Sequence, residues 1–422
     1  MNIAIVGAGV TGVTLAHALL RDGHRVQVYE QRQTAAEEAS FACGGLLSAG
    51  WPSPLAAPGM AWELLYPGSS ATAIRLAQGL RPANTAWLFR WWLHTRKKAH
   101  AAQQNAALAL TQLSQRELLR TNADLKLEYE TTEGLTVLVR SAHDRERLGG
   151  YLQWLNDAGI KHQVGDASLA LSTEPGLNTQ TPLHTAIHLP EDAVGNCRQF
   201  TGALKRVAQQ QGATFSFSHT IQAIRPISGG VELDVLQQKS GINTLVHFDA
   251  VVLCSGVASL GLLQPLNIQL PLRNLRSHSL SANLRDPLDA PKSGVIDSLH
   301  NIGITRLGQR IRITGGQELG NTKPAPHAGV LKQLYAALFD WFPGAAQMNS
   351  IQTWTGHTSV LPDGLPALGA TAVPGVWLNV GHGLRGWSMA SGSARVLTDL
   401  LAQRECPIDW QAFSTKRWER AE

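Results

Sequence analysis

The hydrophobic pattern of the first thirty residues changes its period once, and this change predicts a strand, a turn and a helix. Residues 3–6 are a short apolar run, which is typical of a buried parallel strand. Residues 7–12 then read GAGVTG, and apolar positions recur at helical spacing from Val10 to Leu20. A second strand is predicted at 25–29. The opening stretch is therefore predicted to be a βαβ unit.

Two other interpretations of this uncharged opening are weaker. A secretory signal needs a positive charge ahead of its apolar stretch, but the first positive residue is Arg21. A membrane span would be apolar throughout, whereas three glycines and His17 interrupt this stretch. A second uncharged run, 39–62, contains three prolines and is expected to be an irregular, buried loop.

Strand and helix patterns alternate along the rest of the chain, without an internal repeat. The run FDAVVLCSGVAS at 248–259 is continuously apolar and ends in Ser-Gly, which is typical of a central strand that delivers its following loop to a ligand. Helices are predicted at about 83–124, 145–158, 197–211 and 386–401, and strands within 127–140 and at 214–217, 231–246, 303–315 and 377–380.

The composition is typical of a folded protein and limits the classes of partner that it is expected to bind. The chain has 422 residues, of which 44% are hydrophobic and 16% charged, and this length allows two domains. The formal charge of +5 suits an anionic cofactor, an acidic substrate or an anionic membrane surface. Nucleic-acid binding is disfavoured, because no dense basic run with interleaved aromatic residues spans the chain. The four cysteines are far apart and form no CxxC pair, so no metal site or disulfide framework is predicted and a cytoplasmic location is expected.

The glycines of the opening turn predict a dinucleotide site. Gly7 permits the tight turn, Gly9 lets the backbone approach a pyrophosphate, and Gly12 lets the helix pack closely on the strand. Glu30 ends the second strand, where a carboxylate can accept hydrogen bonds from a ribose. Near the other end of the chain, the turn GHG at 381–383 presents a second helix start directly after a strand.

Several motifs together resemble one protein family over nearly the whole chain. They are the GxGxxG turn, SFACGGLLSAGWPSPLAAPG, LPEDAVGNCRQFTGAL, ITRLGQRIRITGGQE, WTGHTSVLPDGLPALG and LNVGHGLRGWSMASGSARVLTDLL. The chain resembles the small subunit of bacterial D-amino-acid dehydrogenases, within the FAD-dependent amine oxidoreductases that include D-amino-acid oxidase, glycine oxidase and sarcosine oxidase.

The resemblance implies an α/β fold in two parts. A discontinuous, Rossmann-like FAD-binding domain is expected at 1–60, 191–265 and 350–422, and a substrate domain built on an antiparallel β-sheet at 61–190 and 266–349. FAD is expected to be held non-covalently, although Cys43 stands where relatives often have Asn. The residues expected to bind FAD are Gly7, Ala8, Gly9, Val10, Thr11, Gly12, Glu30, Gln31, Arg32, Ser40, Ala42, Cys43, Gly44, Gly45, Leu46, Leu47, Ile221, Ser255, Gly256, Gly381, His382, Gly383, Leu384, Arg385, Gly386 and Trp387.

The expected reaction is hydride transfer from the Cα of a D-amino acid, or of a related secondary or cyclic amino acid, to flavin N5, followed by hydrolysis of the imine. Relatives usually read W-x-G-x-R-P-x-T-P-D, in which the arginine holds the substrate carboxylate. Here Thr358 takes the arginine's place. The residues considered as substrate contacts are Arg385, Arg276, Arg306, His357, His278 and Thr358. No catalytic residue is assigned with certainty.

Three other functions stay open. An oxidase of the same fold would pass the electrons to O₂, with carboxylate-free amines among its candidate substrates. An NAD-linked dehydrogenase would use only the first βαβ unit, and a flavoprotein subunit would lack catalysis. The resemblance also implies a quinone or another electron acceptor. The segment NTAWLFRWWLHTRKKAH at 84–100 combines four large aromatic residues with four cations, which suits either a helix on the inner face of the membrane or a helix with buried tryptophans and a solvated basic end.

Overall fold

The computed structural model describes residues 1–53, 55, 57, 74–76, 82–320 and 328–418. Its first sheet has six strands in the order β18-β19-β12-β1-β2-β8. All neighbouring pairs are parallel except β18 and β19. The strands are β1 (Asn2–Val6), β2 (Arg25–Glu30), β8 (Thr214–Phe217), β12 (Ala250–Leu253), β18 (Ala367–Ala370) and β19 (Val376–Val380).

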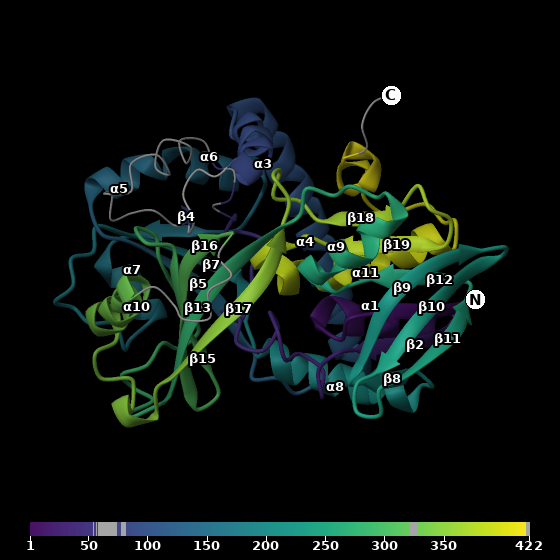
Figure 1. Ribbon diagram of the computed structural model, residues 1–422. Helices are drawn as coiled ribbons and strands as arrows, with labels where there is room; N and C mark the ends of the chain where they lie inside the picture. The colour runs from purple at the N-terminus through teal and green to yellow at the C-terminus, as the bar shows by residue number, and fades with distance from the viewer. Residues whose placement is uncertain (54, 56, 58–73, 77–81, 321–327, 419–422) are drawn as a thin grey trace.

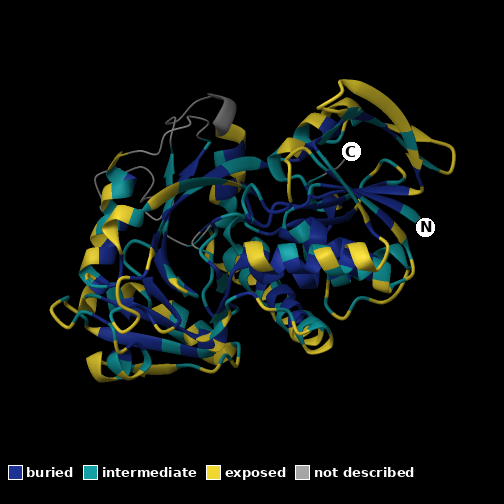
Figure 2. Ribbon diagram, turned by 90° about the horizontal axis from the view of Figure 1, so that it is seen from below, coloured by how far each residue is buried: buried dark blue, intermediate teal, exposed yellow. Residues whose placement is uncertain are grey.

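Both faces of this sheet are covered. On one face, apolar side chains of α1 (Val10–Arg21), α8 (Cys197–Gln210) and α11 (Gly386–Leu401) form one core with those of α4 (Lys97–Leu125). On the other face, the three-stranded antiparallel sheet β9 (His219–Ile227), β10 (Gly230–Gln237) and β11 (Ile242–Phe248) packs against the strands. Figure 2 shows the strands of the six-stranded sheet as mainly buried and the outer surfaces of the surrounding helices as exposed.

A second, ten-stranded sheet lies beside the first (Figure 1). Its main path is β17-β13-β16-β15-β14-β5-β7-β3, and most neighbours are antiparallel. Helix α10 (Ala328–Trp341) packs its apolar side chains against this sheet. The strands are β3 (Leu46–Leu47), β4 (Ile74–Leu76), β5 (Thr132–Val139), β6 (Gln163–Gly165), β7 (Thr185–Val194), β13 (Arg273–Asn283), β14 (Gly294–Asp297), β15 (Ile302–Leu307), β16 (Arg310–Leu319) and β17 (Gln352–Val360).

The α/β fold class, with a Rossmann-like nucleotide domain and a largely antiparallel sheet, is thereby confirmed. Strand β17 belongs to the ten-stranded sheet, although the expected division assigned residues 350–422 to the FAD-binding domain. The chain crosses between the two sheets immediately after this strand. The domain boundaries themselves stay predictions.

Two long predicted helices are each divided in two. The stretch 83–124 forms α3 (Pro82–His94) and α4, with the break at residues 95 and 96. The stretch 145–158 forms α5 (Ala142–Arg147) and α6 (Gly149–Asp157), and the break falls at Leu148, just before two glycines that weaken a helix. Two shorter helices are α7 (Ala167–Thr173) and α9 (Ser259–Leu263).

Candidate active site

The carboxyl ends of parallel strands in the six-stranded sheet bring three loops together. Strand β1 ends at the glycine turn, β12 ends at Cys254 and Ser255, and β19 ends at Gly381. In open α/β sheets, ligands bind in the crevice outside these ends. The topology therefore assembles a binding site from segments that are more than three hundred residues apart in the sequence.

The glycine turn is tightly packed at two of its three positions. Gly7 has a φ of +109°, and a Cβ there would lie 2.9 Å from the carbonyl oxygen of Cys254. A Cβ on Gly12 would lie 2.0 Å from the carbonyl oxygen of Gly7. Gly9 is different, because it meets only Ser40 Oγ at 3.5 Å and faces an open cavity. Its missing side chain leaves the backbone accessible to a ligand.

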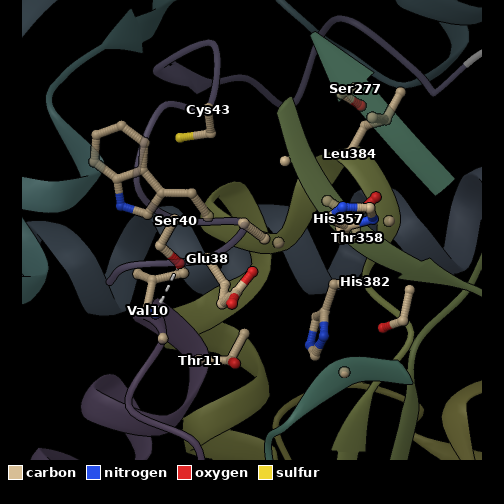
Figure 3. Close-up of a pocket in the computed structure, with 18 of the residues that line it drawn as sticks. Val10, Thr11, Glu38, Ser40, Cys43, Ser277, His357, Thr358, His382 and Leu384 are labelled. Atoms are coloured by element: carbon tan, nitrogen blue, oxygen red, sulfur yellow. Dashed lines mark hydrogen bonds between the residues drawn. The ribbon is translucent and has the colours of Figure 1, made fainter. Parts of the chain in front are cut away.

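Glu30 and Ser40 hold the turn in place. The carboxylate of Glu30 accepts hydrogen bonds from the backbone N–H groups of Ala8 at 2.7 Å and Arg32 at 2.8 Å. Burial raises the pKa of Glu30, and these two backbone hydrogen bonds oppose the shift. The hydroxyl of Ser40 accepts a hydrogen bond from the Val10 N–H at 3.1 Å, at the start of α1 (Figure 3).

The second turn, 381–383, leads into α11. Its His382 is buried, and its Nε2 lies 3.0 Å from the hydroxyl oxygen of Ser393. Burial lowers the pKa of His382 to about 4, so its ring is neutral at pH 7. This residue is better placed to fix the loop than to carry a proton.

These loops form one wall of a cavity of about 560 Å³, and the ten-stranded sheet forms the other wall. Figure 3 shows Ser40 and Cys43 on one side of this cavity and His357 and Thr358 on the other. The predicted residues that line it are Gly7, Gly9, Val10, Thr11, Glu30, Gln31, Ser40, Ala42, Cys43, Gly44, Gly45, Leu46, Ile221, Ser255, Gly256, His278, His357, Thr358, Gly381, His382, Gly383, Leu384, Arg385, Gly386 and Trp387.

Four residues predicted to bind FAD do not line the cavity. Ala8 and Gly12 are used within the turn itself, Leu47 lies in the hydrophobic core, and the Arg32 side chain pairs with Glu38 at the surface. Their contact with the cofactor stays a prediction.

Two of the three arginines considered as substrate contacts also lie outside the cavity lining. Arg276 is fully buried, and its Nη1 lies 3.7 Å from Glu318 Oε2. Arg306 donates from its Nε to the carbonyl oxygen of Gly308 at 3.1 Å. Neither side chain lines the cavity, so we do not retain them as substrate contacts.

On the substrate-side wall, the polar side chains are held by neighbours. His278 Nε2 lies 3.2 Å from a carboxylate oxygen of Glu318, and its Nδ1 lies 3.0 Å from the Thr355 hydroxyl. Burial lowers the pKa of His278, and Glu318 partly opposes that shift. The hydroxyl of Thr358 donates to the carbonyl oxygen of Leu275 at 3.1 Å.

His357, on the same wall, pairs with an amide side chain. Its Nδ1 lies 2.9 Å from Asn274 Nδ2. Burial is the main cause that lowers the pKa of His357, and the charge of Arg276 adds to it. His278 and His357 are therefore both held toward the neutral form.

Arg385 lies at the edge of this cavity and also lines a smaller hollow beside His100, Gln103 and Asp363. Burial lowers its pKa to about 10, so the guanidinium is still charged at pH 7. It makes no hydrogen bond or ion pair with any side chain that the structure describes. A half-buried cation without such a partner is well suited to bind an anionic group.

Sequence patterns had not indicated several lining residues. Ser277 lines the cavity together with the predicted His278 although the two are adjacent on β13, because a register shift between Arg276 and His278 breaks the strand alternation. No sequence motif marks this irregularity. Other lining residues that were not predicted are Glu38, Ser48, Trp51, Asn301, Thr314, Gln317 and Trp354.

Within the described ranges, no three His, Cys, Asp or Glu side chains are grouped to hold a metal. Nor does any described helix have the length and apolar character needed to cross a membrane.

The fold and this cavity define a flavin-type oxidoreductase, and comparison with known proteins identifies the family. The profile of the FAD-dependent oxidoreductase family matches residues 2–400. The chain is also similar to D-amino acid dehydrogenases of Vibrio cholerae (strain M66-2), at 31% identity over 100% of both chains, and of Rhizorhabdus wittichii, at 32% identity over 99% of this chain and 100% of the other. The chain belongs to the FAD-dependent oxidoreductase family.

Solved structures agree on the fold. Glycine oxidase from Geobacillus kaustophilus superimposes with a TM-score of 0.77 at 21% identity, covering 99% of each chain. L-proline dehydrogenase from P. horikoshii gives a TM-score of 0.76 at 15% identity, covering 99% of this chain and 98% of the other. At these identities the similarity concerns the fold.

The cavity fits FAD by its own geometry. The open backbone at Gly9 and the start of α1 face it, which is the arrangement that binds a pyrophosphate. Residues 381–387 line it at the start of α11, where backbone N–H groups favour electron-rich atoms. The residues present therefore match the cofactor of the family.

Proposed function

We propose that this protein oxidises the Cα–N bond of a D-amino acid, or of a related secondary or cyclic amino acid, with Arg385 binding the substrate carboxylate. The observation that carries the proposal is the half-buried guanidinium of Arg385 in the cavity lining, without a charged partner among the described side chains. The name of the similar Vibrio cholerae protein supports an amino-acid substrate.

Bound FAD supplies the hydride acceptor for this reaction. The protein's part is to hold the substrate so that its Cα–H points to the acceptor and to keep water out of the cavity. Arg385 would fix the carboxylate as a charge-assisted pair. His357 and His278, both held toward the neutral form by burial, would accept or donate hydrogen bonds near the amine without competing for the carboxylate.

Thr358 takes little part in this proposal, because its hydroxyl already donates to a backbone carbonyl group. A threonine cannot form the bidentate pair that an arginine forms with a carboxylate. The carboxylate would therefore bind at a different point of the cavity from that used by relatives with arginine at this position. We also propose that FAD is held without a covalent bond, by the backbone N–H groups at the starts of α1 and α11.

The test is an anaerobic flavin-reduction screen with purified holoprotein. D- and L-amino acids, N-methyl and cyclic amino acids, and amines without a carboxylate are added separately, and loss of the flavin absorbance band is followed. The proposal expects reduction by carboxylate-bearing D-amino or cyclic substrates. Reduction by carboxylate-free amines alone would overturn the role of Arg385, and reduction by none of them would indicate a non-catalytic flavoprotein.

The reduced enzyme is proposed to pass its electrons to a quinone at the inner face of the membrane. Helix α3 supports a peripheral contact, because Phe89 is 60% exposed and Trp92 is 45% exposed on one side of it. Arg96 lies over the Trp92 ring at 4.9 Å, and Lys97 follows it. Exposed aromatic rings beside cations are typical of helices at a lipid interface. Stoichiometric hydrogen peroxide during turnover would instead favour an O₂-using oxidase.

A further inference from the structure

Two of the four cysteines, Cys43 and Cys197, line the wall of the cavity on the side of the six-stranded sheet. Cys43 lies on the loop before β3, and Cys197 is the first residue of α8. They are 154 positions apart, so no sequence spacing suggests a pair.

A backbone pairing brings the segments that carry the two cysteines together. In the antiparallel pair β3 and β7, Leu47 faces Ala193 and Leu46 faces Val194. Beyond these strands, the Gly195 N–H donates to the Gly45 carbonyl oxygen at 2.9 Å. Cys43 lies two residues before Gly45, and Cys197 lies two residues after Gly195.

The two side chains lie close enough to influence one another, because each thiol contributes to the pKa shift of the other. The surroundings also favour a thiolate at Cys43. The guanidinium of Arg312 is buried and donates from its Nη1 to the Cys43 carbonyl oxygen at 3.1 Å, and the Gly45 N–H points to the sulfur. Thiols beside cations and N–H groups are the reactive ones.

The two cysteines differ in their expected roles. The hydrogen bond from Cys197, the Gly45 N–H and the Arg312 charge lower the pKa of Cys43, whereas burial raises the pKa of Cys197. Cys43 is half-buried and Cys197 is almost fully buried. The more accessible sulfur is thus the better nucleophile, and the deeper one is placed to resolve its oxidised form.

We propose that Cys43 and Cys197 are a redox-active dithiol that a hydroperoxide converts to an intramolecular disulfide in the cavity wall. The Cys43 thiolate attacks one peroxide oxygen, the O–O bond breaks, and a sulfenic acid and water form after proton uptake. The Cys197 sulfur then attacks the sulfenic sulfur, so that the S–S bond forms and a second water leaves. Peroxide is reduced by two electrons and the two thiols are oxidised by two.

The disulfide would tie the cavity loop 40–47 to the first turn of α8. Both elements hold parts of the proposed flavin site, so oxidation would act on the cavity without contact with the substrate. The reaction needs no amino acid and no particular electron acceptor, so its outcome is independent of the proposed activity.

Peptide mapping of the full-length holoprotein tests this directly. Trypsin cleavage after Lys and Arg places each cysteine in a different peptide: Cys43 in 33–75, Cys197 in 162–198, Cys254 in 240–273 and Cys406 in 405–416. The protein is treated with hydrogen peroxide without substrate, remaining thiols are alkylated under denaturing conditions, and the digest is analysed by mass spectrometry. The expected result is a covalent 33–75/162–198 pair that disappears after reduction with dithiothreitol.

Three variants make the test specific. Cys43→Ser is expected to abolish the linked pair, and Cys197→Ser is expected to leave a Cys43 sulfenic acid that dimedone traps. Cys406→Ser, outside the cavity, is expected to form the linked pair as the unsubstituted protein does. At pH 7, Cys43 in the reduced protein is expected to react with iodoacetamide at least tenfold faster than Cys406.

Recovery of Cys43 and Cys197 as separate alkylated peptides, after peroxide has oxidised Cys406, would overturn the proposal. Equal alkylation rates at Cys43 and Cys406 would overturn the assignment of Cys43 as the nucleophile. In Cys43→Ser, a disulfide between peptide 162–198 and the peptide of Cys254 or Cys406 would show that another sulfur can pair with Cys197.

Discussion

At the scale of single residues, the proposed carboxylate site depends on Arg385. Its guanidinium is charged at pH 7, is partly buried in the cavity lining, and has no hydrogen-bond or ion-pair partner among the described side chains. A charge in such a position is costly for the folded protein unless an anion binds to it. This cost is the physical reason to expect a carboxylate there.

Replacing Arg385 by Ala is therefore expected to raise the KM of the preferred amino acid by about ten- to a hundredfold, since a charge-assisted hydrogen bond contributes about 1.5–3 kcal/mol. Steady-state kinetics with an artificial electron acceptor measures the change. Arg306→Ala is the matched control, because that arginine donates to backbone carbonyl groups away from the cavity and its loss should leave KM unchanged. An unaltered KM in Arg385→Ala would remove this residue from the substrate site.

At the scale of elements, the contact of α1 with the glycine turn sets the position of the helix start. A Cβ on Gly12 would lie 2.0 Å from the Gly7 carbonyl oxygen, which no rotation of a side chain can relieve because the contact is with backbone. The helix would have to move away from β1, and its first N–H groups would move with it.

Gly12→Ala is expected to lower the free energy of unfolding by about 1–3 kcal/mol or more and to weaken FAD retention. Urea unfolding and the flavin-to-protein absorbance ratio after gel filtration measure the two effects. Gly202→Ala is the control within α8, where the nearest atom to the new Cβ is Arg206 Nη1 at 4.0 Å. That change should be neutral or stabilise by up to about 1 kcal/mol. Full FAD retention in Gly12→Ala would contradict the prediction.

Helix α3 divides its aromatic residues between two faces. Trp87 and Trp91 are buried, and Trp87 Nε1 donates to the Pro271 carbonyl oxygen at 2.8 Å. Phe89 and Trp92 are exposed, with ring centroids 6.0 Å apart. The buried pair anchors the helix, and the exposed pair is available to a membrane surface.

The double variant Phe89→Ser/Trp92→Ser is expected to reduce binding to vesicles that contain anionic lipid by tenfold or more, while the fold is retained because neither ring is in the core. Vesicle cosedimentation measures this binding at low and at physiological salt concentration. Leu245→Ser, which removes a 58% exposed residue from the outer strand β11, is the control. Equal sedimentation of the two variants would exclude α3 as the contact.

At the scale of the whole molecule, buried histidines couple stability to pH. Burial lowers the pKa of both His17 and His382 to about 4, from an ordinary value of 6.5. Between pH 6.5 and 4 the unfolded chain binds more protons at these residues than the folded protein, so stability falls as pH falls. Burial raises the pKa of Asp192 to about 6. Between pH 6 and 4 the folded protein therefore binds more protons at Asp192 than the unfolded chain, so this residue increases stability as pH falls.

Acidification from pH 7.5 to 5 is expected to lower the free energy of unfolding by about 2 kcal/mol for each histidine. The raised pKa of Asp192 is expected to increase it by about 1 kcal/mol over the same range. Urea unfolding at the two pH values measures the net loss. His17→Leu, in the core of α1, should reduce the difference by roughly 2 kcal/mol. A variant with the same pH dependence as the unsubstituted protein would show that His17 is not held neutral by the fold.

Much of the nucleotide half was predictable because its signals are local. The predicted strand at 214–217 and the helix at 386–401 match the observed bounds, and the helix from 197 differs only at its last residue. Gly7, Gly9 and Gly12 indicated the strand, the turn and the helix by their spacing, since a tight turn and a close helix contact both require glycine. The substrate-side wall has no comparable local pattern.

By itself, the sequence determined the α/β class, the glycine turn and the family, because hydrophobic period and glycine spacing act over a few neighbouring residues. The tertiary structure decided which polar groups meet. It removed Arg276 and Arg306 from the cavity, and it placed Arg385, Cys43 and Cys197 in the lining. These contacts depend on strand register and on chain segments far apart in sequence, and a register shift of one residue reverses which side chains face the cavity.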